Sequence, residues 1–166
     1  INITSILMTI PSLALFGIMV VLFSPINQGL GIVPAISAII IYSLLPITRN
    51  TYLALQQVSP DMIDAAIGIG MSESQILWQI KMPLSIPTIM AGIRNAIVIG
   101  VAVTTYAFLI AAGGLGFFIF AGIGRANYIM IITGAIIISF LGIGLNFLFL
   151  KIEDTITPRG LKSEKS

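Results

Sequence analysis

The residues whose side chains could take part in chemistry are few, and they lie outside the apolar stretches. All six carboxylates fall in one polar island or near the end of the chain: Asp61, Asp64, Glu73, Glu153, Asp154 and Glu164. The sequence has no cysteine and no histidine, which excludes thiolate chemistry and removes the commonest metal ligand and general base. We therefore predict no catalytic site and no metal site. Because a proton-driven transporter needs ionisable groups within its spans, any uphill transport would draw its energy from outside this chain.

The polar island extends between Tyr52 and Pro87 and predicts a short helix, a turn and a second short helix. Ser59 followed by Pro60 is typical of an N-cap and the first helical position. Gly70 stands where the first helix would end, because glycine accepts the left-handed backbone that is common there. A loop organised in this way between membrane spans indicates a surface that binds a partner protein.

The second short helix is predicted to open at a capping box formed by Ser72 and Gln75 and to run toward Lys81. Pro83 and Pro87 are expected to stop it before the next span, because proline lacks the N–H that a helix interior needs. Residues 52–85 would then form a loop separate from the spans on either side.

The composition assigns the chain to the membrane proteins. Charged residues make up 8% of it and hydrophobic residues 57%, whereas about a quarter of the residues are charged in soluble domains. Pro11, Pro34 and Pro46 would kink or end helices here, which neighbouring helices can tolerate. We predict an all-α polytopic protein with one transmembrane domain, 1–150, a tail, 151–166, and four spans: 6–23, 30–47, 86–112 and 128–150.

The positive charges orient these spans. If the loop is cytoplasmic, four spans put the tail on the same side, and six cations then lie inside: Arg49, Lys81, Lys151, Arg159, Lys162 and Lys165. Arg125 falls outside, in a segment, 113–127, that we expect to contain a short re-entrant or interfacial helix. The net charge of +2 reflects these few cations at one face of the bilayer, so we predict contact with lipid and no nucleic-acid binding.

The polar island also carries a spaced motif. It reads Asp-Ala-Ala, three residues, Gly, nine residues, Ile, any residue, Met and Pro, at Asp64, Ala65, Ala66, Gly70, Ile80, Met82 and Pro83. The motif resembles the EAA loop of permease subunits of binding-protein-dependent ABC importers, with Asp64 in place of glutamate and Met82 in place of leucine. Similarity to the osmoprotectant branch, which imports glycine betaine, carnitine and choline, extends to the flanking segments 10–17, 41–52, 87–96 and 111–128.

The resemblance implies the fold of a type I ABC importer permease and a set of partners. Two permease subunits, identical or different, would lie side by side in a prokaryotic cell membrane and dock their loops on cytoplasmic ATP-binding subunits. ATP and magnesium would bind on those subunits, with no cofactor on this chain, and an extracellular binding protein would deliver the solute. The resemblance assigns ATPase docking to these loop residues: Asp61, Met62, Asp64, Ala65, Ala66, Ile67, Gly70, Ile80 and Pro83.

The first helix of the loop suits such docking. Ala65 and Ala66 keep its surface thin enough to enter a groove, and Asp61 and Asp64 near its N-terminus are favoured by the helix dipole and could pair with a basic residue of the ATPase. We expect its apolar contact face to consist of Met62, Ile63, Ala66, Ile67 and Ile69.

Four residues of the third predicted span are candidates for lining the transport pathway: Arg94, Thr104, Thr105 and Tyr106. For Arg94, snorkelling to the cytoplasmic interface competes with facing the pathway. We expect Thr104 and Thr105, with Asn146 of the fourth span, to bridge helices. For Tyr106 and the neighbouring phenylalanines, an interfacial belt or side-chain contacts compete with a cation–π cage.

Two alternatives stay open. One is the same kind of permease with methionine or another small solute as substrate, and the other is a passive channel or a structural membrane protein. The chain also opens at Ile1 without methionine, and the family normally has a further upstream span, so we expect the sequence to be a fragment.

Overall fold

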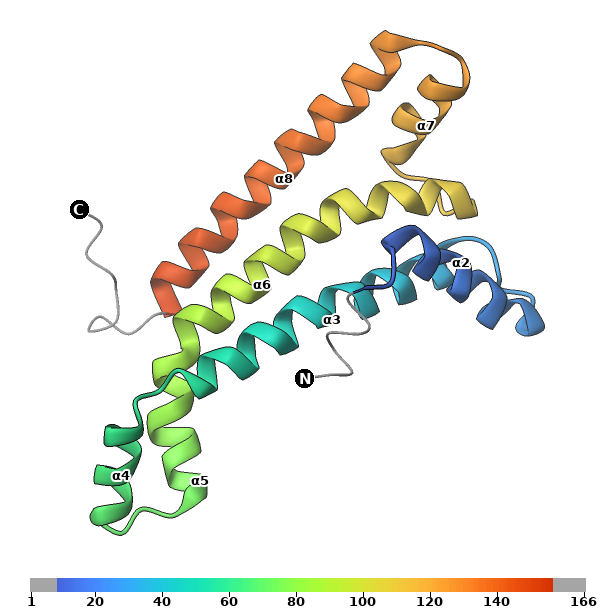
Figure 1. Ribbon diagram of the computed structural model, residues 1–166. Helices are drawn as coiled ribbons and strands as arrows, with labels where there is room; N and C mark the ends of the chain where they lie inside the picture. The colour runs from blue at the N-terminus through green and yellow to red at the C-terminus, as the bar shows by residue number, and fades with distance from the viewer. Residues whose placement is uncertain (1–8, 157–166) are drawn as a thin grey trace.

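The structure is a computed structural model that describes residues 9–156 as helices joined by short turns (Figure 1). No strand occurs in this range, in agreement with the predicted all-α class. Among the elements, η1 and η3 are 3₁₀-helices and η2 is a π-helix. In chain order they are α2 (Ser12–Phe23), η1 (Ser24–Ile26), α3 (Ile32–Gln56), α4 (Pro60–Gly68), α5 (Glu73–Gln75), η2 (Ile76–Lys81), α6 (Met82–Thr104), η3 (Thr105–Ile110), α7 (Gly116–Gly124) and α8 (Tyr128–Ile156).

Three helical stretches are long and apolar enough to cross a membrane, Ile32–Gln56, Glu73–Ile110 and Tyr128–Ile156, where the sequence predicted four spans. The predicted span 6–23 differs, because α2 begins only at Ser12: Pro11 has an extended ψ of 134° and stands outside the helix as its N-cap. The 12 residues of α2 rise about 18 Å, which is less than the ~30 Å of bilayer hydrocarbon. Residues 6–8 of that prediction lie outside the described part of the chain.

The helix α3 continues past Ile47, where the second span was predicted to end. Pro46 lies inside the helix and is buried against its neighbours, which offsets the hydrogen bond that the ring removes. The next turn is tied back by side chains: the Thr48 hydroxyl donates to a carbonyl oxygen one turn earlier at 2.9 Å, and the Asn50 amide donates to the Pro46 carbonyl oxygen at 2.7 Å. The predicted loop 52–85 therefore begins as helix.

The second loop helix does not stop before the third span, so that prediction is wrong. The chain is helical from Glu73 to Ile110. The break expected at Pro83 is avoided because the preceding turn, η2, is a π-helix, in which the Met82 N–H bonds the carbonyl oxygen of Leu77, five residues back. Pro83 then occupies the first turn of α6, where a missing N–H is tolerated, and Pro87 lies inside that helix.

After α6 the chain tightens into η3 and turns at Ala111, whose φ is 62°. The short helix expected within 113–127 is confirmed as α7, which folds back between η3 and α8 (Figure 1). Glycines permit these contacts: a Cβ on Gly116 would overlap the carbonyl oxygen of Thr105, and one on Gly134 would lie 2.7 Å from the Cβ of Phe118.

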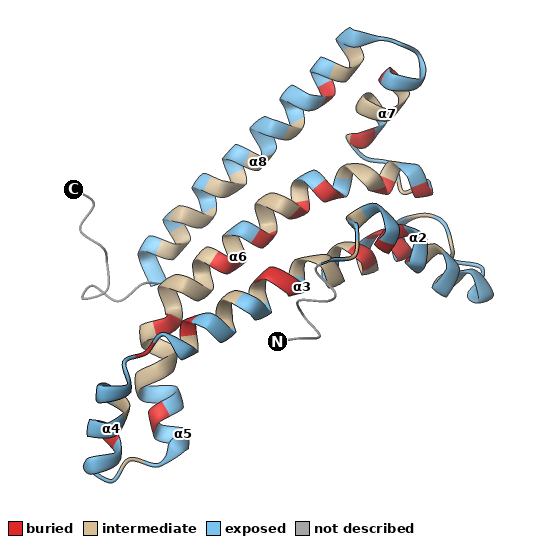
Figure 2. Cartoon of the chain, viewed as in Figure 1, coloured by how far each residue is buried: buried red, intermediate tan, exposed pale blue. Residues whose placement is uncertain are grey.

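The last helix, α8, runs to Ile156, six residues beyond the predicted end of the fourth span at residue 150. Residues 151–156 of the predicted tail belong to the helix, and Glu153 among them lies where it reaches Arg94 of α6. Most apolar side chains of α8 are exposed, which suits a helix surrounded by lipid or by another subunit (Figure 2).

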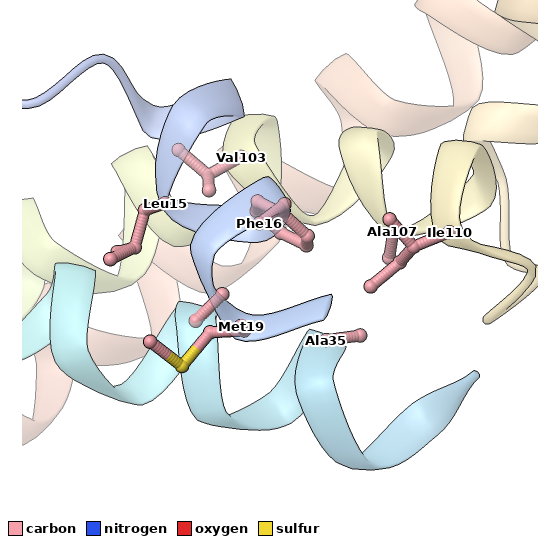
Figure 3. Close-up of a cluster of buried hydrophobic side chains, with 8 residues drawn as sticks. Leu15, Phe16, Met19, Ala35, Val103, Ala107 and Ile110 are labelled. Atoms are coloured by element: carbon pink, nitrogen blue, oxygen red, sulfur yellow. The ribbon is translucent and has the colours of Figure 1, made fainter. Parts of the chain in front are cut away.

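The main buried cluster lies at the end of the molecule away from α4, where α2 crosses α3 and η3 (Figures 1 and 3). Below it, α3 and α6 pack side by side at close range. A Cβ on Gly92 of α6 would lie 2.6 Å from the Cβ of Asn50 on α3. The cluster consists of Leu15, Phe16, Met19, Ala35, Ala38, Val103, Ala107 and Ile110.

Candidate functional site

Residues 57–81 form a helical hairpin, which we call the loop hairpin, and it projects away from the long helices (Figure 1). One arm is α4, and the other is α5 continued by η2. The helix, turn and helix predicted for the polar island are therefore confirmed. The difference is that the second arm continues directly into α6.

The first arm begins at the predicted residues. Ser59 is the N-cap of α4 and Pro60 occupies its first turn. The Ser59 side chain makes no capping hydrogen bond, and its backbone carbonyl oxygen instead accepts from the N–H groups of Met62 at 3.2 Å and Ile63 at 3.3 Å. The proline thus sets the start of the helix through its fixed φ rather than through a side-chain cap.

Gly70 ends the first arm in the left-handed conformation, as predicted, with φ +85°. Two backbone hydrogen bonds close the end of α4: the Gly70 N–H donates to the Ile67 carbonyl oxygen at 2.9 Å, and the Met71 N–H donates to the Ala66 carbonyl oxygen at 3.1 Å. This pair of bonds is the Schellman motif, which needs a residue with positive φ at the position of Gly70.

The second arm opens with the predicted capping box. The Ser72 hydroxyl accepts from the Gln75 N–H at 3.4 Å, and the Gln75 side-chain oxygen accepts from the Ser72 N–H at 2.8 Å. The turn between the arms therefore has a hydrogen-bonded helix end on each side. The hydrogen bonds at the two helix ends fix the angle between the arms.

The outer surface of the loop hairpin carries several large apolar side chains. Met62 and Ile67 are exposed, Ile69 is 80% exposed, and Trp78 on η2, the only tryptophan of the sequence, is 64% exposed. Large apolar side chains exposed on a hairpin that projects away from the long helices indicate a contact surface for another protein. We did not predict Trp78 from the sequence, although a single tryptophan inside the polar island was a usable signal.

Ala66 does not belong to that outer surface, contrary to the prediction. It is 3% exposed and faces the interior of the hairpin, where Ile76 is the buried residue of the other arm. Ala65 is exposed, as are Asp61 and Asp64, and neither carboxylate forms an ion pair within residues 9–156. Asp61 lies in the first turn of α4, where the helix dipole favours a carboxylate.

A hollow of about 810 Å³ separates the two arms on one side of the hairpin. Ile80 and Pro83, two further residues of the spaced motif, lie half-buried where the hairpin joins α6. The hollow is lined by Ile63, Ile67, Met71, Ser72, Glu73, Ser74, Ile76, Leu77 and Lys81.

Arg94 was predicted to snorkel to an interface or to face a pathway, and the structure pairs it with Glu153. Its Nη1 atom lies 3.3 Å from a carboxylate oxygen of Glu153, which joins α6 to the last turns of α8. The guanidinium also lines a polar hollow between these helices and α3.

Thr104 and Thr105 do not bridge helices as predicted. The Thr104 hydroxyl donates to the Gly100 carbonyl oxygen and the Thr105 hydroxyl to the Ala102 carbonyl oxygen, both at 2.7 Å, so each bonds to its own helix. Such bonds satisfy a hydroxyl in an apolar setting without a second helix.

Tyr106 belongs to a group of aromatic rings, which we call the aromatic cluster, at the end opposite to the loop hairpin. Its ring centroid lies 6.3 Å from that of Phe16 on α2 and 6.1 Å from that of Phe120 on α7. The edge-to-face and tilted geometries favour contacts between the rings rather than a cage around a cation. The remaining members are Phe108, Phe117 and Phe118.

Residues 2–160 of the chain match the protein family described as binding-protein-dependent transport system inner membrane component. The chain is 43% identical over 158 residues to the osmoprotectant import permease protein OsmW of Salmonella typhimurium, covering 95% of this chain and 74% of that protein. It is 38% identical over 165 residues to the carnitine transport permease protein OpuCB of Listeria monocytogenes, covering 99% and 73%.

Among solved structures, an inward-facing form of the MetNI methionine ABC transporter superposes with a TM-score of 0.81. The superposition covers 95% of this chain and 74% of that chain at 21% sequence identity. At this identity the likeness shows a shared fold.

Proposed function

This chain belongs to the inner-membrane components of binding-protein-dependent transport systems, and we propose that it serves an ATP-driven importer of quaternary ammonium osmoprotectants. As a member of that family it is a permease subunit of an ABC transporter and not an enzyme, and ATP hydrolysis takes place on a separate ATPase. The solutes that we assign to it are glycine betaine, carnitine and choline.

The assignment of the solutes is supported by the named relatives. The proteins that match nearly the whole chain at 43% and 38% identity are permeases for osmoprotectants and for carnitine. The methionine transporter, at 21% identity, supports the fold but not methionine as the substrate. Methionine therefore serves as the competing solute in the test below.

The loop hairpin is the element that we assign to ATPase docking, and its fixed shape is the observation that carries the proposal. Its turn is hydrogen bonded on both sides, at Gly70 and at Ser72, and its second arm is continuous with α6. Exposed Met62, Ile67 and Trp78 supply apolar contact area. A movement of the ATPase against this surface would be passed to the membrane helices without being absorbed by a flexible linker.

The same proposal places the remaining partners. The hairpin lies on the cytoplasmic side, in keeping with Arg49 and Lys81 at that end, and docks a subunit that binds ATP and magnesium. A second permease subunit, identical or different, covers part of the exposed apolar surface of the long helices. An extracellular binding protein delivers the solute at the end that carries the aromatic cluster.

The solute is tested by uptake in vesicles. The chain is reconstituted with its ATPase and binding protein, and ATP-dependent uptake of radiolabelled glycine betaine is measured with unlabelled carnitine, choline or methionine as competitor. We expect carnitine or choline to compete and methionine to have no effect. Uptake of methionine in place of glycine betaine would overturn the assignment.

The docking surface is tested by co-purification of the ATPase with the permease. Trp78→Ala removes an exposed aromatic side chain of the hairpin, and Phe140→Ala removes one from α8, where Phe140 is 71% exposed. Truncation of an aromatic anchor in an interface commonly weakens binding by about 2 kcal/mol or more, so we expect Trp78→Ala to lose the ATPase and Phe140→Ala to retain it. Equal retention by both variants would place the docking surface elsewhere.

A further inference from the structure

A second polar site lies within the long helices, apart from the loop hairpin. It is a hollow of about 580 Å³ where α3, α6 and α8 converge, and its volume falls within the range of about 300–1,000 Å³ that is usual for small-molecule pockets. One guanidinium and three amides enter it, although the surrounding helices are apolar enough to span a membrane. The lining residues are Asn50, Ala91, Arg94, Asn95, Val98 and Asn146.

The guanidinium of Arg94 is the charged group of this hollow, and its pairing with Glu153 is loose. The distance from Nη1 to the carboxylate oxygen is 3.3 Å, whereas well-formed bonds between a guanidinium and a carboxylate are about 2.7–2.9 Å long. The Glu153 oxygen is buried and forms no hydrogen bond with any described residue. Since a guanidinium carries five donors, Arg94 keeps donors for a second acceptor.

The amides around Arg94 are held in place but only partly used. The Asn50 amide group donates to the Pro46 carbonyl oxygen at 2.7 Å, and its Cβ stands where a side chain on Gly92 would collide. Asn50 is therefore fixed, and its side-chain oxygen remains available as an acceptor. Within residues 9–156, the side chains of Asn95 and Asn146 form no hydrogen bond with each other or with Arg94.

Polar groups gathered inside a membrane bundle are costly, and an arrangement that served only to join helices would pair them with each other. Here Arg94 and the amides keep donors that no described residue accepts from, so an acceptor from outside the chain can enter the hollow. The acceptor must be small and must outcompete a loosely paired carboxylate. A carboxylate group meets both conditions, because it matches the fork of a guanidinium in a bidentate contact.

We propose that this hollow binds the carboxylate end of a zwitterionic solute, with Arg94 as its ligand. The inference rests on the proposed function, since glycine betaine and carnitine carry both a carboxylate and a quaternary ammonium group. The solute carboxylate displaces Glu153 from Arg94, and the released Glu153 faces the cationic end of the solute. Choline has no carboxylate, so its binding does not depend on Arg94.

The competing role for the same residues is a tie between α6 and α8. The two roles differ in the sign of one effect. If the pair is only a tie, removing either charge weakens the protein in the same way. If Arg94 is a ligand and Glu153 its internal competitor, removing Glu153 frees the guanidinium and strengthens binding of the solute.

The test is equilibrium binding to the purified permease–ATPase complex in lipid nanodiscs, without the binding protein. Radiolabelled glycine betaine is the probe, and radiolabelled choline is the control that lacks the carboxylate. We expect Arg94→Gln to weaken glycine betaine binding by about tenfold or more and Glu153→Gln to strengthen it by several-fold. Choline binding should be the same in Arg94→Gln and in the unaltered complex.

Folding is controlled with the double variant Arg94→Gln, Glu153→Gln, which leaves no buried charge without a partner. It should retain the thermal unfolding temperature and still lose glycine betaine binding. Loss of binding in Glu153→Gln, or unaltered glycine betaine binding in the double variant, would reduce the pair to a tie. Absence of saturable glycine betaine binding up to about 50 mM would remove the site. A dissociation constant above that concentration corresponds to a binding free energy weaker than about 2 kcal/mol.

The outcome is separate from that of the proposed function. If the complete transporter imports glycine betaine and the binding experiment fails, only the site at Arg94 is wrong. If the transporter imports no osmoprotectant, the substrate class itself is wrong.

Discussion

The loop hairpin and the aromatic cluster lie at opposite ends of the molecule and are held together in different ways. The hairpin is fixed by hydrogen bonds between near neighbours, which join backbone groups at Gly70 and join backbone to side chain at Ser72. Its exposed side chains include the apolar Trp78. In the aromatic cluster, rings from α2, η3 and α7 contact one another, and the contact of Phe16 with Tyr106 joins distant parts of the chain. One end leaves large apolar side chains exposed, and the other uses its aromatic side chains in contacts within the chain.

This difference predicts where each end is sensitive. Substitution of the outer side chains of the hairpin should leave its folding unchanged. Substitution at its turn or on its inner face should alter its shape. The cluster end should tolerate little change of volume, because close contacts there join separate helices.

Ala66→Asp should have the largest effect, because Ala66 is the buried contact on the inner face of the hairpin. A buried carboxylate without a partner costs several kcal/mol, so the arms should separate and transport should stop while the long helices remain inserted. The measurement is hydrogen exchange of residues 60–81 together with uptake in vesicles.

Ala65→Asp is the matched control, because Ala65 is the exposed neighbour on the same helix. It should leave the exchange of the hairpin unchanged, whatever its effect on the ATPase contact. If residues 60–81 exchange their amide hydrogens as slowly in both variants as in the unaltered protein, the inner face of the hairpin contributes nothing to its shape.

Gly116→Ala should destabilise the opposite end by about 1–3 kcal/mol, because the new methyl group overlaps the Thr105 carbonyl oxygen where α7 meets η3. Gly124→Ala at the end of the same helix adds a methyl group where nothing lies within 4 Å. Thermal unfolding in detergent should separate the two variants. Equal unfolding temperatures would mean that α7 is not held by this close contact.

Gly70→Val should have the smallest effect on stability, about 1–2 kcal/mol, because the strain lies in the positive φ alone and no atom lies within 4 Å of the added Cβ. We expect ATP hydrolysis to continue while solute uptake falls, since the arms would meet at another angle. Gly70→Asn, which tolerates the left-handed region, should be milder. Reconstituted vesicles give both rates, and equal coupling in the two variants would show that the turn angle is not transmitted.

The sequence predicted those features of the hairpin whose cause lies within a few residues. The pair Ser72 and Gln75 specifies a capping box by type and spacing, and Gly70 ends a helix because few other residues adopt its backbone angles. The spaced motif likewise lies within one stretch of chain, so it indicated the loop directly.

One failure has a local cause that residue types do not reveal, and the other two have causes elsewhere in the chain. Pro83 was expected to end a helix, and it does not because a π-turn precedes it. Glu153 was assigned to a tail because its partner, Arg94, lies on a distant helix that spacing alone does not bring near. Ala66 was placed on the outer face because helical periodicity does not say which side of α4 meets the second arm.

The continuity of the chain from Glu73 to Ile110 also limits how permeases of this kind can exchange parts. A helix turns about 100° and rises about 1.5 Å with each residue, so one residue inserted in η2 would rotate the rest of α6 and carry Arg94 away from Glu153. A hairpin grafted from another permease must therefore bring its following membrane helix with it. The second arm of the hairpin and α6 are therefore expected to be exchanged between permeases as one unit, both in evolution and in engineered chimeras.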